Sequence, residues 1–535
     1  MFHNIKQNSS PLFLAIISIL LILSSALYGK NAGMNHYFDT PLDTRAQQMA
    51  AAITDHVYRL NGRYTAHSQV YETLLRNGMS DVPDLYTPLG LKSPPYSDAN
   101  FWNNLILKAS SLHPLTSPRY SSGTLSFVNL EDMGIVNFYK LSFSLFGLNI
   151  EGFYKLFFVL LLISVIFIYV TFWRQIGILF SVNLILVGLF LSICSINIPG
   201  ALSTVSNGRF LNTLAVIPAF HLAVILWRPL NTKFLIVLST IFQSLFLAFV
   251  ILMRSNAMWA VIFLGLSALV LIFYRIKPIL SSAPFFKLVR NMFTWPMLTI
   301  FLSLASVNLI YKANLHPAYT LMDELLPHHY FWHSLAYGIG LDNPEKVMPE
   351  INGARGDSIG YKMAALYMKK EMGIEYQPDH IYFSSPLFPQ LGRPQSYERM
   401  AKAAVIDFYK NHPTYFLKLT FIVKPSLTFN MYKDALIKII KNNYLYLISL
   451  LVPLLIIFLY FSKKIEFLKQ FKFSLLIITG LMIFSLLPAI IAYPSLLSSA
   501  DTVALIFSIG VGLALLSINY IVSFLMPKKI LKAKN

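Results

Sequence analysis

The sequence predicts an all-α polytopic membrane protein with about ten transmembrane helices and two large mixed outer loops. Three observations support this fold class: the composition, the length of the apolar runs, and the uneven placement of charge. Of the 535 residues, 56% are hydrophobic and only 13% are charged, with a mean hydropathy of +0.58. A soluble domain carries roughly 25% charged residues. The chain is therefore not an ordinary soluble globule.

Apolar runs of about 20 residues recur along the chain, which is the length needed to cross a hydrocarbon core about 30 Å thick. The first run is long for a signal peptide, so it is interpreted as an uncleaved anchor, although Ser24, Ser25 and Ala26 would form a passable cleavage site. The expected spans are roughly 11–29, 154–173, 176–195, 210–227, 234–253, 257–274, 294–311, 443–461, 473–492 and 502–525.

The distribution of basic residues predicts the orientation. With the N-terminus in the cytoplasm, the short cytoplasmic segments hold 16 Lys and Arg but a single acid, Glu466, whereas the other 23 of the 24 acids lie elsewhere. Lys and Arg concentrate in cytoplasmic loops. We therefore expect a multi-pass protein of the cell inner membrane, with both termini in the cytoplasm and both large loops in the periplasm.

The net charge of +19 does not indicate nucleic-acid binding, because the basic residues separate apolar runs instead of clustering on a soluble surface. The single cysteine, Cys194, lies inside an apolar run and is interpreted as a small packing residue. A disulfide framework is thereby excluded.

These features divide the chain into five parts. Long loops are usually functional, so the chemistry is expected in the two large ones. The parts are an N-terminal anchor (1–29), a first periplasmic loop with interfacial helices (30–153), a six-span membrane core (154–311), a second periplasmic loop (312–442), and three C-terminal spans with a basic cytoplasmic tail (443–535).

Several loop segments have helical periodicity. Apolar residues recur at helical spacing in 43–61, 135–146, 360–372 and 397–409. The segment 416–429 is apolar but contains Lys418, Lys424 and Pro425, so we expect a helix at the membrane interface instead of a span.

Four acids in the first loop are candidates for a catalytic base. Glu131 and Asp132 precede the helix expected before the second span, and Asp39 and Asp43 follow the first span. A carboxylate just outside the membrane could take a proton from a sugar hydroxyl. The alternative is structural, since Asp132 and Asp43 could also stabilise the starts of helices.

Two arginines are candidates for a phosphate contact. Arg209 and Arg254 lie in short outer connections, where the bias toward cytoplasmic basic residues disfavours them. A guanidinium at this depth could bind a phosphate through two hydrogen bonds, or it could serve lipid headgroups or a loop acid.

The second loop offers a different set of polar residues. His329 and His333 are four residues apart on an expected helix, but a metal site needs at least a third ligand, so Trp332 and His333 are expected to pack or stack against a substrate. Asp357, which follows Arg355 and Gly356 in a Gly-rich turn, is a further candidate for substrate binding, and the alternative is an exposed ion pair in that turn. No metal site and no cofactor are predicted, and no nucleotide-binding motif is present.

The layout resembles the GT-C superfamily of integral-membrane glycosyltransferases. The similar segments are Glu131 to Gly134, Lys140 to Gly147 with Tyr154, Asn207 to Arg209, and the pairs Tyr397-Glu398, His412-Pro413 and Lys424-Pro425. The resemblance covers the span layout of most of the chain, and its motifs are short.

The resemblance implies a polyprenyl-phosphate sugar as donor and a lipid or glycan as acceptor. It makes Glu131 and Asp132 the acid pair and Arg209 or Arg254 the phosphate contact. In many members the acid lies soon after the first span, whereas this pair lies about 100 residues later, which keeps Asp39 and Asp43 as candidates. The alternatives are a transporter or flippase of lipid-linked glycans, a glycan polymerase or ligase, and a non-enzymatic protein of envelope assembly.

Overall fold

A computed structural model provides the three-dimensional structure of the chain. It describes residues 2–33, 133–147, 151–195, 208–228, 234–279, 298–306, 309, 331–354, 356–373, 395–495 and 499–525. Helices make up these ranges almost entirely, and no strand occurs within them. The prediction of an all-α protein is confirmed for this part of the chain. The expected helix at 43–61 lies outside it.

Among the described residues, six helical segments are long and apolar enough to cross a membrane, so the chain is a multi-pass membrane protein. They belong to α1 (Phe2–Gly33), α6 (Glu151–Phe172), α7 (Ile176–Ser195), α11 (Phe234–Met253), α23 (Ile465–Ser485) with α24 (Leu487–Ile491), and α25 (Ala500–Leu525).

Three shorter apolar segments coincide with further expected spans. The first consists of η2 (Asn212–Ala215) and α10 (Val216–Trp227). The second consists of η3 (Ser255–Ala257) and the first part of α12 (Met258–Ile279), and the third is the second half of α22 (Lys424–Ser462). Of the run expected at 294–311, the structure describes a helix at 298–306.

Helix α7 lies at the centre of the bundle. It contacts α1, α6, α10, α22, α23 and α25, and its residues are buried on every side, as expected for a helix that is apolar all round. A polar triad joins three of these helices: Ser18 donates to Asn183 at 3.0 Å, and Asn183 donates to Tyr169 at 3.1 Å. By contrast, α1 exposes Leu12, Leu20 and Leu27, as a lipid-facing helix would.

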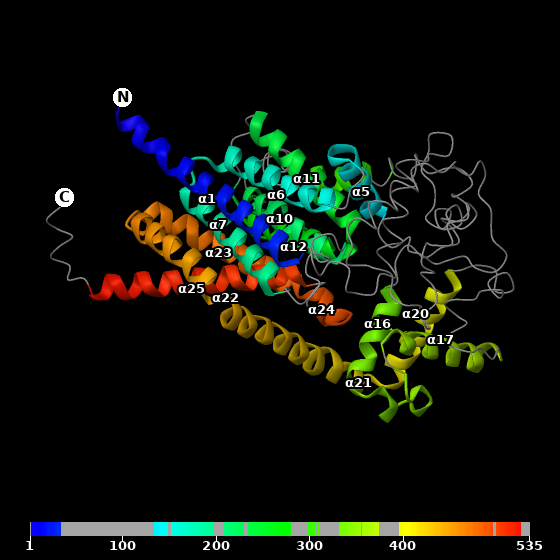
Figure 1. Ribbon diagram of the computed structural model, residues 1–535. Helices are drawn as coiled ribbons and strands as arrows, with labels where there is room; N and C mark the ends of the chain where they lie inside the picture. Colours follow the sequence, from blue (N-terminus) through cyan, green and yellow to red (C-terminus); the bar gives the residue numbers. More distant parts are fainter. Residues whose placement is uncertain are drawn as a thin grey trace.

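A second, smaller unit lies beside one end of the bundle, far from the start of α1 and the end of α25 (Figure 1). We call it the lobe. It consists of α16 (Phe331–Ile339), the 3-10 turns η4 (Gly340–Asp342), η5 (Pro344–Lys346) and η6 (Pro349–Ile351), α17 (Asp357–Met372) and α20 (Gln395–Asn411). The helices expected at 360–372 and 397–409 are thereby confirmed.

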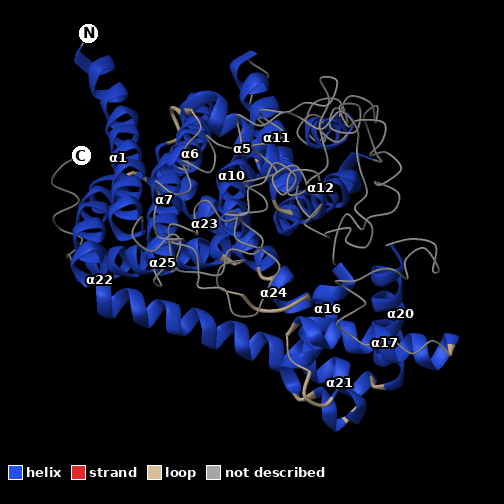
Figure 2. Cartoon of the chain, turned by 45° about the vertical axis from the view of Figure 1, so that its right-hand side comes forward, coloured by secondary structure: helices blue, strands red, loops and turns tan. Residues whose placement is uncertain are grey.

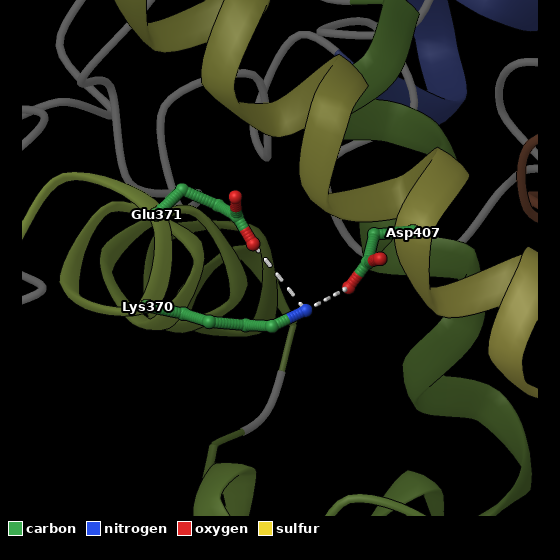
Figure 3. Close-up of polar contacts among 3 residues, drawn as sticks. All are labelled: Lys370, Glu371 and Asp407. Carbon is green, nitrogen blue, oxygen red and sulfur yellow. Dashed lines mark hydrogen bonds and ion pairs between the residues drawn. The ribbon is translucent and has the colours of Figure 1, made fainter.

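The lobe has its own apolar interior, built mainly by α16, α17 and α20. Ala336, Ile359, Met363 and Val405 are among its buried residues. On the surface, Lys370 of α17 lies 3.3 Å from Asp407 of α20 and 3.4 Å from Glu371 (Figure 3). Exposed ion pairs contribute little to stability, so apolar packing holds the lobe together.

One long helical run connects the lobe to the bundle. It starts with α21 (Pro413–Lys418), continues through the π-helical turn η7 (Leu419–Val423), and ends with the 39-residue α22. The first half of α22 runs as a separate rod along the outside of the bundle (Figures 1 and 2). The segment 416–429 is therefore part of one continuous helical run instead of a helix of its own, and the expected loop boundary at 442 falls inside α22.

Candidate functional site

The tight hairpin between α11 and α12 is the centre of the candidate site. Arg254 has an extended backbone (φ −151°, ψ 105°), which ends α11 and turns the chain into η3. The Arg254 amide donates to the Val250 carbonyl at 2.8 Å, and the Arg254 carbonyl accepts from Ala257 at 3.0 Å. These two backbone hydrogen bonds stabilise the turn of the hairpin. The side chain of Arg254 is half-buried.

The start of α5 (Met133–Phe146) packs directly on this hairpin. A Cβ atom placed on Gly134 would lie only 2.3 Å from the Leu252 carbonyl carbon and from the Met253 nitrogen. Only a glycine can therefore approach the main chain of α11 so closely at this point. The contact fixes α5, which confirms the helix expected at 135–146, against the residues that immediately precede Arg254.

The start of α25 contacts α12 just after the same hairpin. The Trp259 indole Nε1 donates to Asp501 Oδ2 at 2.6 Å, and the amide of Thr502 donates to Asp501 Oδ1 at 2.9 Å. The side chains of Asp501 and Trp259 are both almost completely buried. Asp501 is the second residue of α25, where a helix dipole favours a negative charge. This carboxylate therefore links α12 to α25.

Arg209 belongs to the same region of the fold. It lies in the short helix α9 (Gly208–Leu211), which continues into η2, and η2 contacts α25, α11 and η3. Two polar residues of η2, Asn212 and Thr213, are buried there. The structure thus brings the backbone of Arg209, the Arg254 hairpin and Asp501 to one end of the bundle, which we call the hairpin end.

The four acids expected from the sequence, Glu131, Asp132, Asp39 and Asp43, lie outside the residues that the structure describes. The description of α5 begins at Met133, one residue after Asp132. Asp501 was missed by the sequence analysis. It lies beside the apolar run 502–525, and its partner Trp259 is 242 residues away in the chain, so the sequence carries no local signal for the pair.

The three residues expected from the second loop lie in the lobe, on elements separate from the Arg254 hairpin. On α16, the ring of Trp332 faces the Lys402 ammonium at 5.5 Å, and the ring of His333 stacks on Tyr361 at 5.2 Å. Asp357 is the first residue of α17, after Gly356 with its positive φ of 59°. In the described part of the chain, no group of three or more His, Cys, Asp or Glu could hold a metal ion.

A buried lysine marks the junction between the lobe and the bundle. Lys424 is 1% exposed, and its ammonium donates to the Ile491 carbonyl at 2.7 Å. Gly338 of α16 leaves room for this arrangement, because a Cβ atom there would lie 2.0 Å from the Ala492 oxygen and 2.8 Å from Lys424 Nζ. Burial lowers the pKa of Lys424 to about 8. Lys424 thus anchors the start of α22 to the last residue of α24.

Comparison with known proteins assigns no family to this arrangement. No family model matches the chain, and neither a curated protein nor a solved structure has significant similarity to it.

Proposed function

We propose that the protein is a membrane glycosyltransferase that moves a sugar from a polyprenyl-phosphate carrier to a lipid or glycan acceptor on the periplasmic side of the cell inner membrane. The observation that carries this proposal is the contact of Gly134 with the main chain of Leu252 and Met253. In the sequence, the acids Glu131 and Asp132 lie just before Gly134, and Arg254 follows Met253. The contact therefore joins the two segments that hold the expected base and the expected phosphate ligand.

The reaction needs one group to take up a proton and another to stabilise the leaving phosphate. A carboxylate of the acid pair takes the proton of the acceptor hydroxyl while the hydroxyl oxygen bonds to the sugar's anomeric carbon. The bond from that carbon to the phosphate oxygen breaks, and the phosphate keeps the electron pair. A cation directed at this oxygen stabilises the transition state, which is the role proposed for Arg254 or Arg209.

The proposed topology has ten spans, with both termini in the cytoplasm. Its support is the charge distribution, together with the position of the lobe far from the start of α1 and the end of α25 (Figure 1). Topology reporters fused after residues 100 and 380 should be active only as periplasmic reporters, and a fusion after residue 528 only as a cytoplasmic one. Cytoplasmic activity at either loop position would overturn the orientation.

A transporter or flippase of lipid-linked glycans is the main alternative. Transporters commonly carry ionisable groups near the middle of the membrane. In the six described spans, Asp, Glu, Lys and Arg occur only within the first eight residues of a segment, the deepest being Lys472 in the segment that begins at Ile465. This pattern favours an enzyme whose chemistry takes place at the membrane surface. A glycan polymerase or ligase would share that surface chemistry, and a scaffold of envelope assembly would lack it.

Two single substitutions, each made on its own, test the proposed base. Asp132→Asn and Glu131→Gln keep the side-chain shape and remove the charge, and Asp407→Asn on the lobe surface is the matched control. A general base contributes about 10²–10⁴ in rate, so one of the first two variants should lose that factor in a transfer assay with radiolabelled polyprenyl-phosphate sugars. Full transfer by both would exclude the acid pair and make Asp39 and Asp43 the next residues to test. If those are also dispensable, the enzyme proposal fails.

The phosphate contact has its own test. Arg254→Ala should weaken donor binding by about 1.5–3 kcal/mol, the contribution of a charge-assisted hydrogen bond. Arg228→Ala is the control, because Arg228 packs over the ring of Phe473 at 4.9 Å and has no proposed role in binding. An unchanged donor affinity in the Arg254 variant would leave this arginine as a lipid-headgroup anchor.

A further inference from the structure

The first half of α22 has three distinct faces. A narrow stripe packs against the protein through Lys424, Thr428, Ala435 and Ile439, which are at most 4% exposed. Side chains that point away from this stripe are large and apolar, and they are 41–69% exposed. These are Phe429, Leu436, Ile437, Ile440 and Tyr444.

The third face is charged. Asp434 and Lys441 are exposed on it and Lys438 is half-buried, whereas the exposed Lys433 lies among the apolar side chains, between Ile440 and Tyr444 around the helix. With about 100° between successive residues of an α-helix, Asp434, Lys438 and Lys441 fall on one side and Leu436 and Ile440 on another. Two exposed faces of opposite character next to a thin buried stripe are typical of an amphipathic helix at a membrane surface.

The bilayer is the occupant that continuity of the chain favours for the apolar face. The same helix continues into the apolar segment Leu447–Ser462, which has the composition of a membrane helix. The 39 residues of α22 would measure about 58 Å, well beyond a hydrocarbon core about 30 Å thick. The first half therefore extends out of the core, and its last turns before Leu447 lie in the headgroup region.

The charge of the segment indicates which headgroups it meets. Three lysines and one acid lie within about 14 residues of Leu447. In the proposed topology this segment is on the periplasmic side, where basic residues so close to a span run against the usual bias. Lysines near an anionic lipid surface each contribute about a fivefold gain in affinity.

We propose that the first half of α22 is a lipid-binding helix. Its apolar face contacts the acyl chains at the edge of the bilayer, and Lys433, Lys438 and Lys441 bind the headgroups of anionic phospholipids. This inference does not depend on sugar transfer.

The apolar face can be tested with a pair of labels on the full-length protein in vesicles. In a Cys194→Ser background, Leu436→Cys and Asp434→Cys place a fluorescent label on nearly opposite sides of α22, and Ile440→Cys provides a second apolar position. Spin-labelled phosphatidylcholine should quench the labels at 436 and 440 several-fold more than the label at 434. Equally weak quenching at all three positions would overturn the proposal, as would disulfide-linked dimers through positions 436 or 440, which would indicate a second copy as the occupant.

The lysines can be tested with the label at position 436. Spin-labelled phosphatidylglycerol should quench this label several-fold more than spin-labelled phosphatidylcholine at the same density, and high salt should reduce the ratio. Replacing Lys433, Lys438 and Lys441 together by Gln should bring the ratio close to one. Replacing Lys463, Lys464 and Lys469 by Gln, at the other end of α22 and in α23, should leave it unchanged. A ratio of one in the wild type, or an equal loss in both triple variants, would contradict the assignment of these lysines to anionic lipid.

Discussion

Replacing Gly134 by alanine tests whether α5 is held against the hairpin end by direct main-chain contact. The added Cβ atom would lie 2.3 Å from two main-chain atoms of α11, at Leu252 and Met253. Ordinary contacts between carbon atoms are about 3.5–4.0 Å, so α5 must move away by about 1 Å or more. Main-chain atoms of a packed helix cannot rotate aside as a flexible side chain can.

The magnitude follows from two opposing effects. Overpacking of this kind costs about 1–3 kcal/mol, and alanine recovers at most about 1 kcal/mol of helix propensity. The matched control is Gly510→Ala in α25, because a Cβ atom there meets nothing within 4 Å. The control should therefore gain stability from propensity alone, whereas Gly134→Ala should lose it.

Thermal unfolding of the purified proteins in one detergent provides the measurement, read as the fraction that stays monodisperse after heating. We expect a lower Tm for Gly134→Ala and an equal or higher Tm for Gly510→Ala. Under the proposed function, Gly134→Ala should also lose transfer activity below its Tm, because it displaces α5, which directly follows Asp132 in the sequence, from the Arg254 hairpin. A Tm and an activity equal to wild type would refute both the close approach and the site built on it.

Three further predictions concern single polar groups. Trp259→Phe removes the indole donor to Asp501 and should destabilise the protein by about 1.5–3 kcal/mol in thermal unfolding, whereas Asp501→Asn, which keeps an acceptor, should cost less. Because burial lowers the pKa of Lys424 from 10.5 to about 8, the unfolded chain binds more protons between these values. The free energy of unfolding should therefore rise with pH over that interval by at most about 1.4 kcal/mol per unit, and a Lys424→Met variant that keeps the wild-type slope would contradict this. Tyr415→Phe removes a 2.7 Å hydrogen bond to the Ile339 carbonyl and should cost about 1 kcal/mol, so an unchanged Tm would show that packing alone holds the lobe to α21.

Local sequence patterns predicted the parts of the fold that local physics determines. The apolar runs of α6, α7, α11 and α25 are uninterrupted over roughly the thickness of a membrane, so composition alone identifies them. The lobe helices α17 and α20 were predicted from a second local signal, because their apolar residues recur at helical spacing.

The length of α22 was not predicted, and the reason is physical. Lys433, Asp434 and Lys441 lower the hydropathy of its first half, so the sequence suggested a loop that ends at 442. Backbone hydrogen bonds continue through these residues regardless of side-chain polarity, and the exposed position of the helix accommodates the charges. Hydropathy reports the environment of a segment and gives little information about where a helix begins.

The candidate site was only partly accessible from the sequence. Arg254 was chosen as a candidate because a cation in a short outer connection is unusual. Asp501 and Gly134 were given no role, because their roles depend on partners that are distant in the chain. An acid beside an apolar run has many structural explanations, and a glycine reveals a close approach only when the opposing helix is known.

The π-helical turn between α21 and α22 has a consequence for how the length of the chain is constrained. Buried residues of this run follow one another at intervals of four, five and four, from Tyr415 to Leu419, Lys424 and Thr428. The interval of five spans the π turn Leu419–Val423, which holds one residue more than an α-helix would. Deleting a single residue there would restore a regular α-helix in which the buried residues follow at intervals of four, so they would keep their shared face, whereas deleting one from the regular part of α22 would rotate everything before it by about 100°. Only the second change would turn Tyr415 and Leu419 out of the interior of the lobe, so the π turn can lose one residue at a far smaller cost than the regular helix that follows it.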